Sequence, residues 1–321
     1  MQTALWTLRR VGVSVLTLLG VSILIFASVR LMPGDYADLA LGPLASDAQR
    51  QEALAEAGLE QPVVAQFGQW LLGVVTGDLG HSYVSDVSVG EELARRLPVT
   101  ATIAVAAIVL TVLLGLPLGL ATALRSTRRG GGAGGRLLSA FGISVPEFVL
   151  GGLVVFLVSS TAIGLSVGGY RPPGEDLAAF ARSLLLPTLV LAVACSAVTA
   201  RNTRDAVLNV LVEPHIAASV ARGESPGFIV RHHIVRNAMP PVLTLLATIV
   251  ATLLGGTVIV ETIFNVPGIG AYLVTALGRR DYLVVQAVVL LAAIVFIVAN
   301  LVVDLVATAL DPRLRAARIA A

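Results

Sequence analysis

Long apolar stretches alternate with short polar segments along this 321-residue chain. A helix crosses the roughly 30 Å hydrocarbon core of a bilayer with about 20 apolar residues, because lipid offers no hydrogen-bond partners to an open backbone. Six stretches reach or approach that length. The pattern therefore predicts an all-α, polytopic transmembrane helical bundle with about six spans, at residues 11–31, 97–124, 137–163, 183–200, 237–260 and 282–310.

The first stretch could be a cleaved secretion signal or a retained span. Its uncharged run is long for the core of a signal peptide, and the residues that follow, Arg30-Leu-Met-Pro33, form no small-residue cleavage site. We therefore expect residues 1–32 to hold a cytoplasmic N-terminus and the first transmembrane helix.

Composition supports a membrane protein and excludes several kinds of chemistry. The chain is 56% hydrophobic and 13% charged, whereas soluble domains carry about 25% charged residues. The one cysteine, Cys195, lies in an apolar run, so this chain alone builds no disulfide framework or thiolate metal site. All 22 basic residues are arginine, which excludes the phosphate-binding lysine of a P-loop. No Ser/His/Asp set or metal cluster can be assembled, so we expect a non-catalytic chain with no metal and no cofactor of its own.

Arginines are distributed unevenly among the segments between the spans. If both termini are cytoplasmic, the inner segments hold 14 arginines against four acids, and the outer segments hold eight against 13. Because positive residues favour the cytoplasmic side, this bias predicts a multi-pass cell-membrane protein with cytoplasmic termini, including the tail 311–321. The arginines form no exposed stripe, so the net charge of +2 predicts no nucleic-acid partner.

The outer segment, residues 33–96, contains signals for amphipathic helices. Ser46-Asp47 is a helix start, Gly58 is a stop, and residues 62–75 form an apolar-sided run. Such helices would lie on the outer membrane face, where they either meet a partner or substrate or cap the ends of the spans. On the inner side, the glycine-rich segment 125–136 reads as a flexible linker rather than a phosphate site, because no strand precedes it.

The cytoplasmic segment 201–239 is longer than a helical hairpin requires. Pro214 suits the first turn of a short helix, Gly223 suits its C-terminal stop, and Ser225-Pro226 repeats the start signal. Two short helices joined at Gly223 would project from the membrane. We expect a soluble partner to dock there; the alternative is a surface-lying helix that only closes the loop.

At this point the sequence resembles the coupling loop of ABC importer permeases, which reads Glu-Ala-Ala, three residues and then Gly. Ala218 and Gly223 match that pattern. Ala217 replaces the glutamate and Ser219 replaces the second alanine, while Val235-Arg236 replaces a later Leu-Pro.

The whole chain is similar to the peptide/nickel permease family of ABC importers, with motifs in the family's order. The opening motif and the long outer segment resemble the first permease of a heterodimeric pair. The matching motifs are Arg30-Leu-Met-Pro-Gly-Asp35, Gly58-Leu-Glu-Gln-Pro62, Gly77-Asp-Leu-Gly80, Arg96-Leu-Pro98, Val260-Glu-Thr-Ile-Phe264, Pro267-Gly268, Arg280-Asp-Tyr282, Asn300-Leu-Val-Val-Asp304 and Asp311-Pro-Arg313.

The resemblance implies a type I ABC importer permease fold, with a transmembrane core at 97–310 that includes the coupling loop 201–239. It implies a second homologous permease, two ABC ATPase subunits or one heterodimer that bind ATP and Mg, an extracytoplasmic substrate-binding protein and a lipid bilayer. The cargo would be dipeptides, oligopeptides, nickel or haem. The residues implied in coupling to the ATPase are Glu213, His215, Ala217, Ala218, Ser219, Arg222, Gly223, Glu224, Ser225 and Pro226.

Two carboxylates at the spans are candidates for the translocation path. Glu147 follows Val145-Pro146 in the third span, where the family commonly has a small hydroxyl residue. A mid-membrane charge costs about 3 kcal/mol, so Glu147 should face water, a substrate amino group or an internal partner. Ser144 and Glu261 complete the candidate path residues, although Glu261 also suits capping or pairing.

Two other functions stay open on the residues alone. An ion-coupled secondary transporter would usually show internal repeats and several intramembrane charges. A membrane assembly protein without transport activity would use the projecting loop to bind a partner that is not an ATPase. Copurification of a nucleotide-binding subunit separates this last alternative from an importer.

Overall fold

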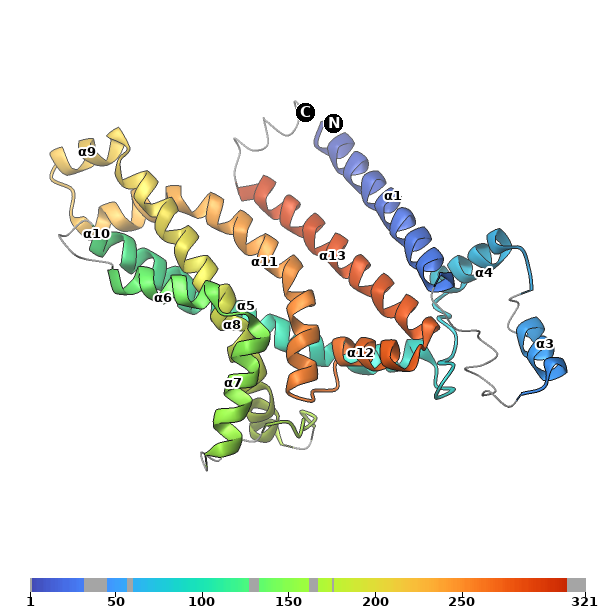
Figure 1. Cartoon of the computed structure of the whole chain (residues 1–321). Coiled ribbons are helices and arrows are strands. Elements are labelled where there is room, and N and C mark those ends of the chain that lie inside the picture. Colours follow the sequence, from blue (N-terminus) through green and yellow to red (C-terminus); the bar gives the residue numbers. More distant parts are fainter. Residues whose placement is uncertain are drawn as a thin grey trace. The chain divides into compact units, whose positions relative to one another are not determined.

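The computed structural model of the chain is helical almost throughout (Figure 1). The structure describes residues 2–31, 45–56, 60–126, 133–161, 167–174 and 176–310. The predicted stop at Gly58, half of the glycine-rich segment and the tail 311–321 lie outside these residues. The elements are α1 (Gln2–Arg30), α3 (Asp47–Glu56), α4 (Val63–Thr76), α5 (Val89–Ser126), α6 (Ala133–Ser144), α7 (Glu147–Ser160), α8 (Leu177–Leu211), α9 (Pro214–Ala221), α10 (Pro226–Phe228), the π-helical segment η1 (Ile229–Val235), α11 (Arg236–Ile263), α12 (Ile269–Arg279) and α13 (Tyr282–Leu310).

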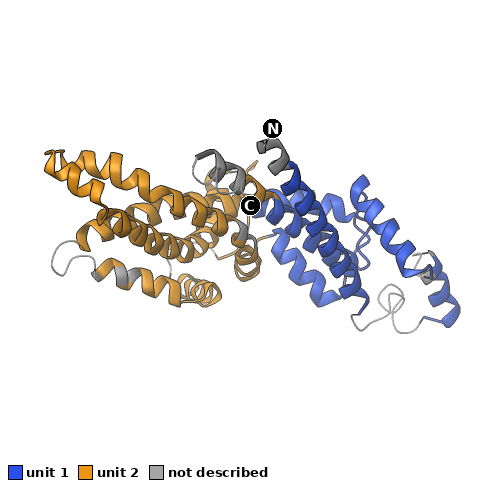
Figure 2. Cartoon of the chain, turned by 90° about the horizontal axis from the view of Figure 1, so that it is seen from above, with its two compact units in different colours: residues 1–100, 267–297 blue, residues 101–266, 298–321 orange. Residues whose placement is uncertain are grey.

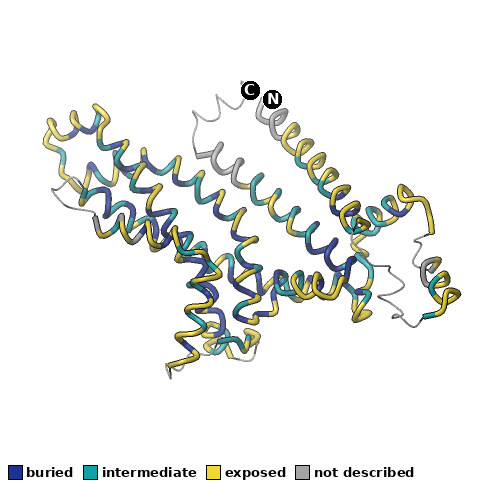
Figure 3. Tube along the Cα trace, in the orientation of Figure 1, coloured by how far each residue is buried: buried dark blue, intermediate teal, exposed yellow. Residues whose placement is uncertain are grey.

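Among the described residues, five helical stretches are long and apolar enough to cross a membrane. They fall on five of the six predicted spans, so the prediction of a polytopic helical bundle is confirmed. Of these helices, α8 is the most buried and α1 the least (Figure 3). The stretches are Leu8–Arg30, Val89–Ser126, Leu177–Leu211, Pro226–Val250 and Tyr282–Val302.

The predicted third span, 137–163, consists of two helices, α6 and α7, rather than one. The chain breaks between α6 and α7 at Val145-Pro146, where Pro146 has φ −60° and ψ 144°. Proline lacks an amide proton and disfavours helical geometry at the residue before it, which ends α6. Glu147 consequently becomes the first residue of α7, where the helix dipole favours a negative charge.

The chain divides into two compact units (Figure 2). Unit 1 consists of residues 1–100 and 267–297, and unit 2 consists of residues 101–266 and 298–321. The helices α5 and α13 each contribute residues to both units.

In unit 1 the predicted amphipathic helices are present. The helix α3 starts at Asp47 as expected, and α4 follows Pro62 and ends at Gly77, which has the left-handed φ of 85°. Aromatic side chains fasten α4 to α1: the Phe26 ring lies 5.3 Å from Phe67 and 5.7 Å from Trp70. The helix α4 therefore packs on α1.

The core of unit 1 joins three elements that are far apart in sequence. Val89 and Leu93 of α5 pack with Ala276 of α12 and with Val284 and Val288 of α13. The helix α12 was not predicted. Its signal is the apolar spacing of positions 269, 272, 273 and 276, which is typical of a helix with one buried face.

In unit 2, α8 packs closely against α5 through glycines of α5. An added Cβ at Gly115 would lie 2.8 Å from Thr199 Cβ, and one at Gly119 would lie 2.5 Å from the carbonyl oxygen of Ala200. Helices in membranes associate through such small residues, because close packing replaces the hydrophobic driving force.

Replacing Gly119 by alanine should therefore destabilise unit 2. The new methyl group meets backbone that cannot rotate away, and overpacking of this kind costs about 1–3 kcal/mol. Thermal unfolding in detergent micelles measures the effect. Gly152→Ala on α7 is the matched control, because an added Cβ there has nothing within 4 Å; equal unfolding temperatures for both variants would contradict the close α5–α8 contact.

Candidate functional site

The elbow, residues 212–228, connects α8 to the helix that contains α11 (Figure 1). Pro214 occupies the first turn of α9, where its fixed φ suits a helix start. Gly223 ends this helix with φ +76°. The Gly223 amide donates to the Val220 carbonyl at 3.0 Å, and the Glu224 amide donates to the Ser219 carbonyl at 3.2 Å. This pair of bonds is the Schellman arrangement, so the predicted short helix and its glycine stop are confirmed.

The second half of the elbow differs from the expectation. Ser225 Oγ accepts from the Phe228 amide at 3.4 Å, and Pro226 lies in the first turn, so the predicted start signal is correct. The helix that starts there is not short, however. Helical geometry at Ile229 and Arg236 carries the backbone from α10 through η1 into α11 without a break.

An apolar cluster holds the elbow in place. Ile216 of α9 is buried against Val207 and Val210 of α8 and against Ile229 and Ile234 of η1. Burying a side chain of this size contributes about 1.5–3 kcal/mol. The elbow is therefore a packed corner and not a loose loop.

Polar contacts fix the turn at Gly223. Arg222 Nη2 donates to Ser219 Oγ at 2.8 Å and to Glu224 Oε1 at 2.6 Å. His233 Nε2 lies 2.9 Å from Glu224 Oε2. The hydrogen bond from Arg222 is the main cause that lowers the pKa of Glu224 below its ordinary 4.5, and His233 contributes less.

The outward side of α9 carries small side chains. Ala217, Ala218 and Ala221 are exposed, and Val220 is 61% exposed. A partner can approach such a surface closely. Of the residues implied in coupling, Glu213, Ala217, Ala218, Arg222, Gly223, Ser225 and Pro226 are exposed, His215 and Glu224 are half-buried, and Ser219 is buried.

The candidate path residues lie in different surroundings within unit 2. An added Cβ at Gly256 of α11 would lie 2.7 Å from Glu147 Oε2 and 3.1 Å from Leu191 Cδ2, so the Glu147 carboxylate lies beside both α8 and α11. Ser144 is exposed and its hydroxyl donates to the Ala140 carbonyl at 2.8 Å. Glu261 is completely buried, which favours a role in pairing within the chain.

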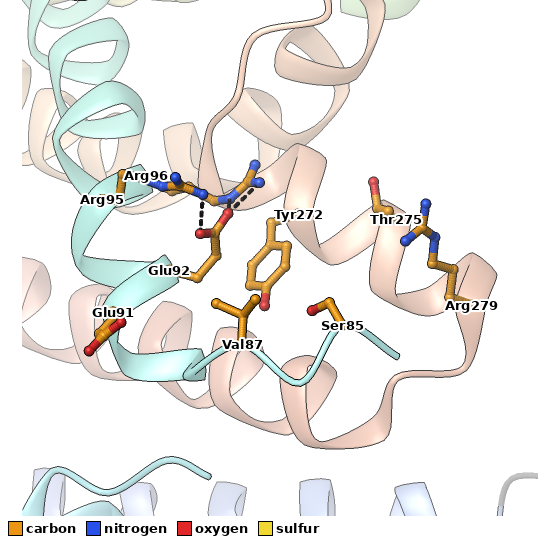
Figure 4. A pocket seen from close by; sticks show the side chains of 9 residues that line it. All are labelled: Ser85, Val87, Glu91, Glu92, Arg95, Arg96, Tyr272, Thr275 and Arg279. Carbon is orange, nitrogen blue, oxygen red and sulfur yellow. Dashed lines mark hydrogen bonds and ion pairs between the residues drawn. The ribbon is translucent and has the colours of Figure 1, made fainter. Parts of the chain in front are cut away.

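Unit 1 holds a cavity of about 570 Å³ between the start of α5 and α12 (Figure 4). Glu92 is 7% exposed and forms ion pairs with Arg95 and Arg96. The guanidinium of Arg96 also lies 4.7 Å from the centre of the Tyr272 ring. Burial is the main cause that raises the pKa of Tyr272. These contacts fasten α5 to α12 and account for the arginine of the Arg96-Leu-Pro98 motif.

Sequence reasoning missed this cavity, although the spacing of Glu92, Arg95 and Arg96 on a helix was a signal for ion pairs.

A neighbouring contact explains a second motif. Asp281 accepts from Ser82 Oγ at 2.5 Å and from the Tyr83 amide at 3.3 Å. The motifs Gly77-Asp-Leu-Gly80 and Arg280-Asp-Tyr282 therefore flank one buried junction.

In the described part of the chain, five helical stretches of membrane-spanning length characterise a multi-pass membrane protein, and its packed elbow carries a surface of small residues. The chain belongs to the family described as binding-protein-dependent transport system inner membrane component, whose model matches residues 115–316. The model of the N-terminal part of such components matches residues 4–104. The resemblance to ABC importer permeases is confirmed, and the family consists of transport permeases rather than ion-coupled transporters or assembly proteins.

Relatives match over nearly the whole chain. The probable peptide ABC transporter permease protein y4tP of Sinorhizobium fredii is 37% identical over 97% of this chain and 99% of its own length. The glutathione transport system permease protein GsiC of Salmonella choleraesuis is 37% identical over 97% of this chain and 98% of its own. A solved chain from a crystal structure of an amino acid ABC transporter with histidines has a TM-score of 0.52 and 15% identity, covering 68% of this chain and 94% of that one. This last likeness shows the fold alone.

Replacing Arg222 by glutamine should raise the pKa of Glu224 toward 4.5. Because the folded pKa is lowered, the pairing of Glu224 stabilises the turn above pH 4.5 and is lost as the pH falls through the lowered value. The carbon-13 shift of the Glu224 carboxyl, followed against pH in micelles, measures this. Arg231→Gln is the control, because Arg231 is exposed and has no described contact with Glu224; an unchanged titration in Arg222→Gln would disprove the assignment.

Proposed function

We propose that this chain is the membrane-spanning subunit of an ABC importer for peptides, in which the elbow receives the motion of partner ATPases. The observation that carries the proposal is the outward surface of α9: exposed alanines on a helix whose other side is held by a buried cluster. Such a surface allows close docking, and its apolar support transmits force. The names of y4tP and GsiC support a peptide-like cargo.

The partners follow from this assignment. A second homologous permease completes the passage, two ABC ATPases or one heterodimer bind ATP and Mg, and an extracytoplasmic binding protein delivers the substrate. This chain carries no ATP site of its own. The arginine bias supports a cytoplasmic position for the elbow and both termini, on the side where ATPases would bind.

Transport requires two states of the helices that open to opposite sides, and an energy source that binds the two states differently. Closure of the ATPases on ATP would move α9 together with the apolar cluster beneath it. The attached helices α8 and α11 would then tilt as rigid bodies, because the elbow joins both of them.

Replacing Gly223 by proline should uncouple ATP hydrolysis from uptake without preventing membrane insertion. Proline fixes φ near −65° and removes the amide that bonds to Val220, so the left-handed turn cannot form. Peptide uptake should fall at least about tenfold, within the range that a lost coupling free energy of about 1–3 kcal/mol produces. Uptake and ATP hydrolysis by the complex in proteoliposomes measure the two effects.

The control is Gly227→Ala, four residues away, where φ is not positive and an added Cβ has nothing within 4 Å. It should leave both activities unchanged. Normal uptake by Gly223→Pro would show that the elbow does not transmit the motion. Solute movement by the purified chain with no ATPase subunit present would overturn the proposed function itself.

A further inference from the structure

One side of α11 is exposed along most of its length. Exposed and buried positions alternate along this helix (Figure 3), and the exposed ones recur every three or four residues, which places them on one face of a helix with 3.6 residues per turn. This threonine face consists of Thr244, Thr248, Thr252, Gly255, Ile259 and Thr262.

The threonine hydroxyls are satisfied within the helix. Thr248 Oγ1 donates to the Thr244 carbonyl at 3.2 Å, Thr252 Oγ1 donates to the Thr248 carbonyl at 3.2 Å, and Thr262 Oγ1 donates to the Val258 carbonyl at 2.8 Å. Each hydroxyl oxygen keeps acceptor capacity, because donation uses only its proton. The face is therefore uncharged and, apart from Ile259, which is 40% exposed, able to accept hydrogen bonds.

Exposed faces elsewhere in the chain have a different composition. On α1 the exposed residues include Leu16, which is 69% exposed, and Leu24, which is 68% exposed; on α7 they include Phe156, also 68% exposed. Such apolar faces favour contact with the acyl chains of lipids. A row of hydroxyls on one side of an otherwise apolar helix favours contact with water. Lipid cannot donate hydrogen bonds to the lone pairs of the hydroxyl oxygens that remain free.

Glu147 supplies an independent observation at the edge of this face. Its carboxylate lies against Gly256, the residue that follows Gly255 and lies one turn beyond Thr252. The side chain is half-buried, and no described residue donates a hydrogen bond to it. An ionised carboxylate among membrane helices needs water or a counter-charge, and ionisable residues at such positions mark substrate pathways.

We propose that the threonine face, with Glu147 at its edge, is a wall of the water-filled passage and that it carries peptides with a free amino group. The threonine oxygens accept hydrogen bonds from peptide amides, which every peptide has, and the Glu147 carboxylate attracts the ammonium group. A wall of neutral acceptors with one anion binds the shared parts of peptides and does not select side chains. This inference rests on the proposed function, because it assumes peptide cargo.

Accessibility of single cysteines tests the wall. In the Cys195→Ala chain, Thr248→Cys and Thr252→Cys are compared with Leu153→Cys, on the exposed apolar face of α7, and with Leu253→Cys, which replaces a side chain that is 3% exposed. Charged methanethiosulfonates are added to the complex in proteoliposomes, with and without ATP. Both threonine positions should react at least about tenfold faster than either control in one of these states, because thiolate forms in water and not in apolar surroundings. Rates no faster than those of Leu153→Cys in every state overturn the proposal.

A second measurement tests whether the Glu147 carboxylate supplies negative charge at this wall. Thr252 is four residues from Gly256, about 6 Å along the axis, and Thr244 is 12 residues away, about 18 Å. Charges act over about 8 Å at physiological ionic strength. At Thr252→Cys the cationic reagent should therefore react faster relative to the anionic one, and Glu147→Gln should abolish this preference. At Thr244→Cys, Glu147→Gln should not change the ratio of the cationic to the anionic reaction rate. A ratio at Thr252→Cys that Glu147→Gln leaves unaltered disproves the role of the carboxylate.

The parent chain separates this inference from the proposed function. If the Cys195→Ala complex takes up a labelled tripeptide with ATP, and the threonine positions still fail to react, the inference alone is wrong. If that complex hydrolyses ATP but takes up no peptide, the proposed cargo is wrong and the inference falls with it.

Discussion

Lipid offers no hydrogen bonds, so each polar group among the apolar helices must find its partner within the chain or in water. The constraint explains why the backbone is helical and why the α11 threonines donate to carbonyls one turn back. It also explains where irregular backbone lies. In the described part of the chain, residues with positive φ, such as Gly77, Gly223 and Arg280, lie between helices and not within them.

Two kinds of interaction, apolar packing and polar contacts, stabilise the elbow. The buried contact of Ile216 contributes about 1.5–3 kcal/mol, whereas an ion pair at the surface such as Arg222 with Glu224 contributes less, because water screens it. Packing therefore holds α9 on the bundle. The polar contacts set the direction in which the chain leaves it, because they form only when Gly223 is left-handed.

Much of this fold could be predicted because its signals are local. Runs of apolar residues marked the spans, and Pro214, Gly223 and Ser225 marked the elbow. The break at Pro146 was hidden within an apolar run that was long enough for a span, and α12 was missed although the spacing of its apolar residues was a signal for it. The burial of Glu261 and the contact of Glu147 with Gly256 could not be predicted, because they depend on which faces of α7, α8 and α11 meet.

The helix that leaves the elbow is the same helix that carries the threonine face. The helix runs from Pro226 through η1 to Ile263, and Pro240 and Pro241, which donate no backbone hydrogen bonds, lie between the elbow and the proposed wall of the passage. The π-helical turns of η1 hold more residues than α-helical turns, and such segments are rare and concentrate at functional sites. Because η1 packs on Ile216, a displacement of α9 acts directly on the turns that set the rotation of α11. A rotation that α11 transmits past Pro240 and Pro241 would turn the threonine face, which would link a movement of the elbow to the proposed passage.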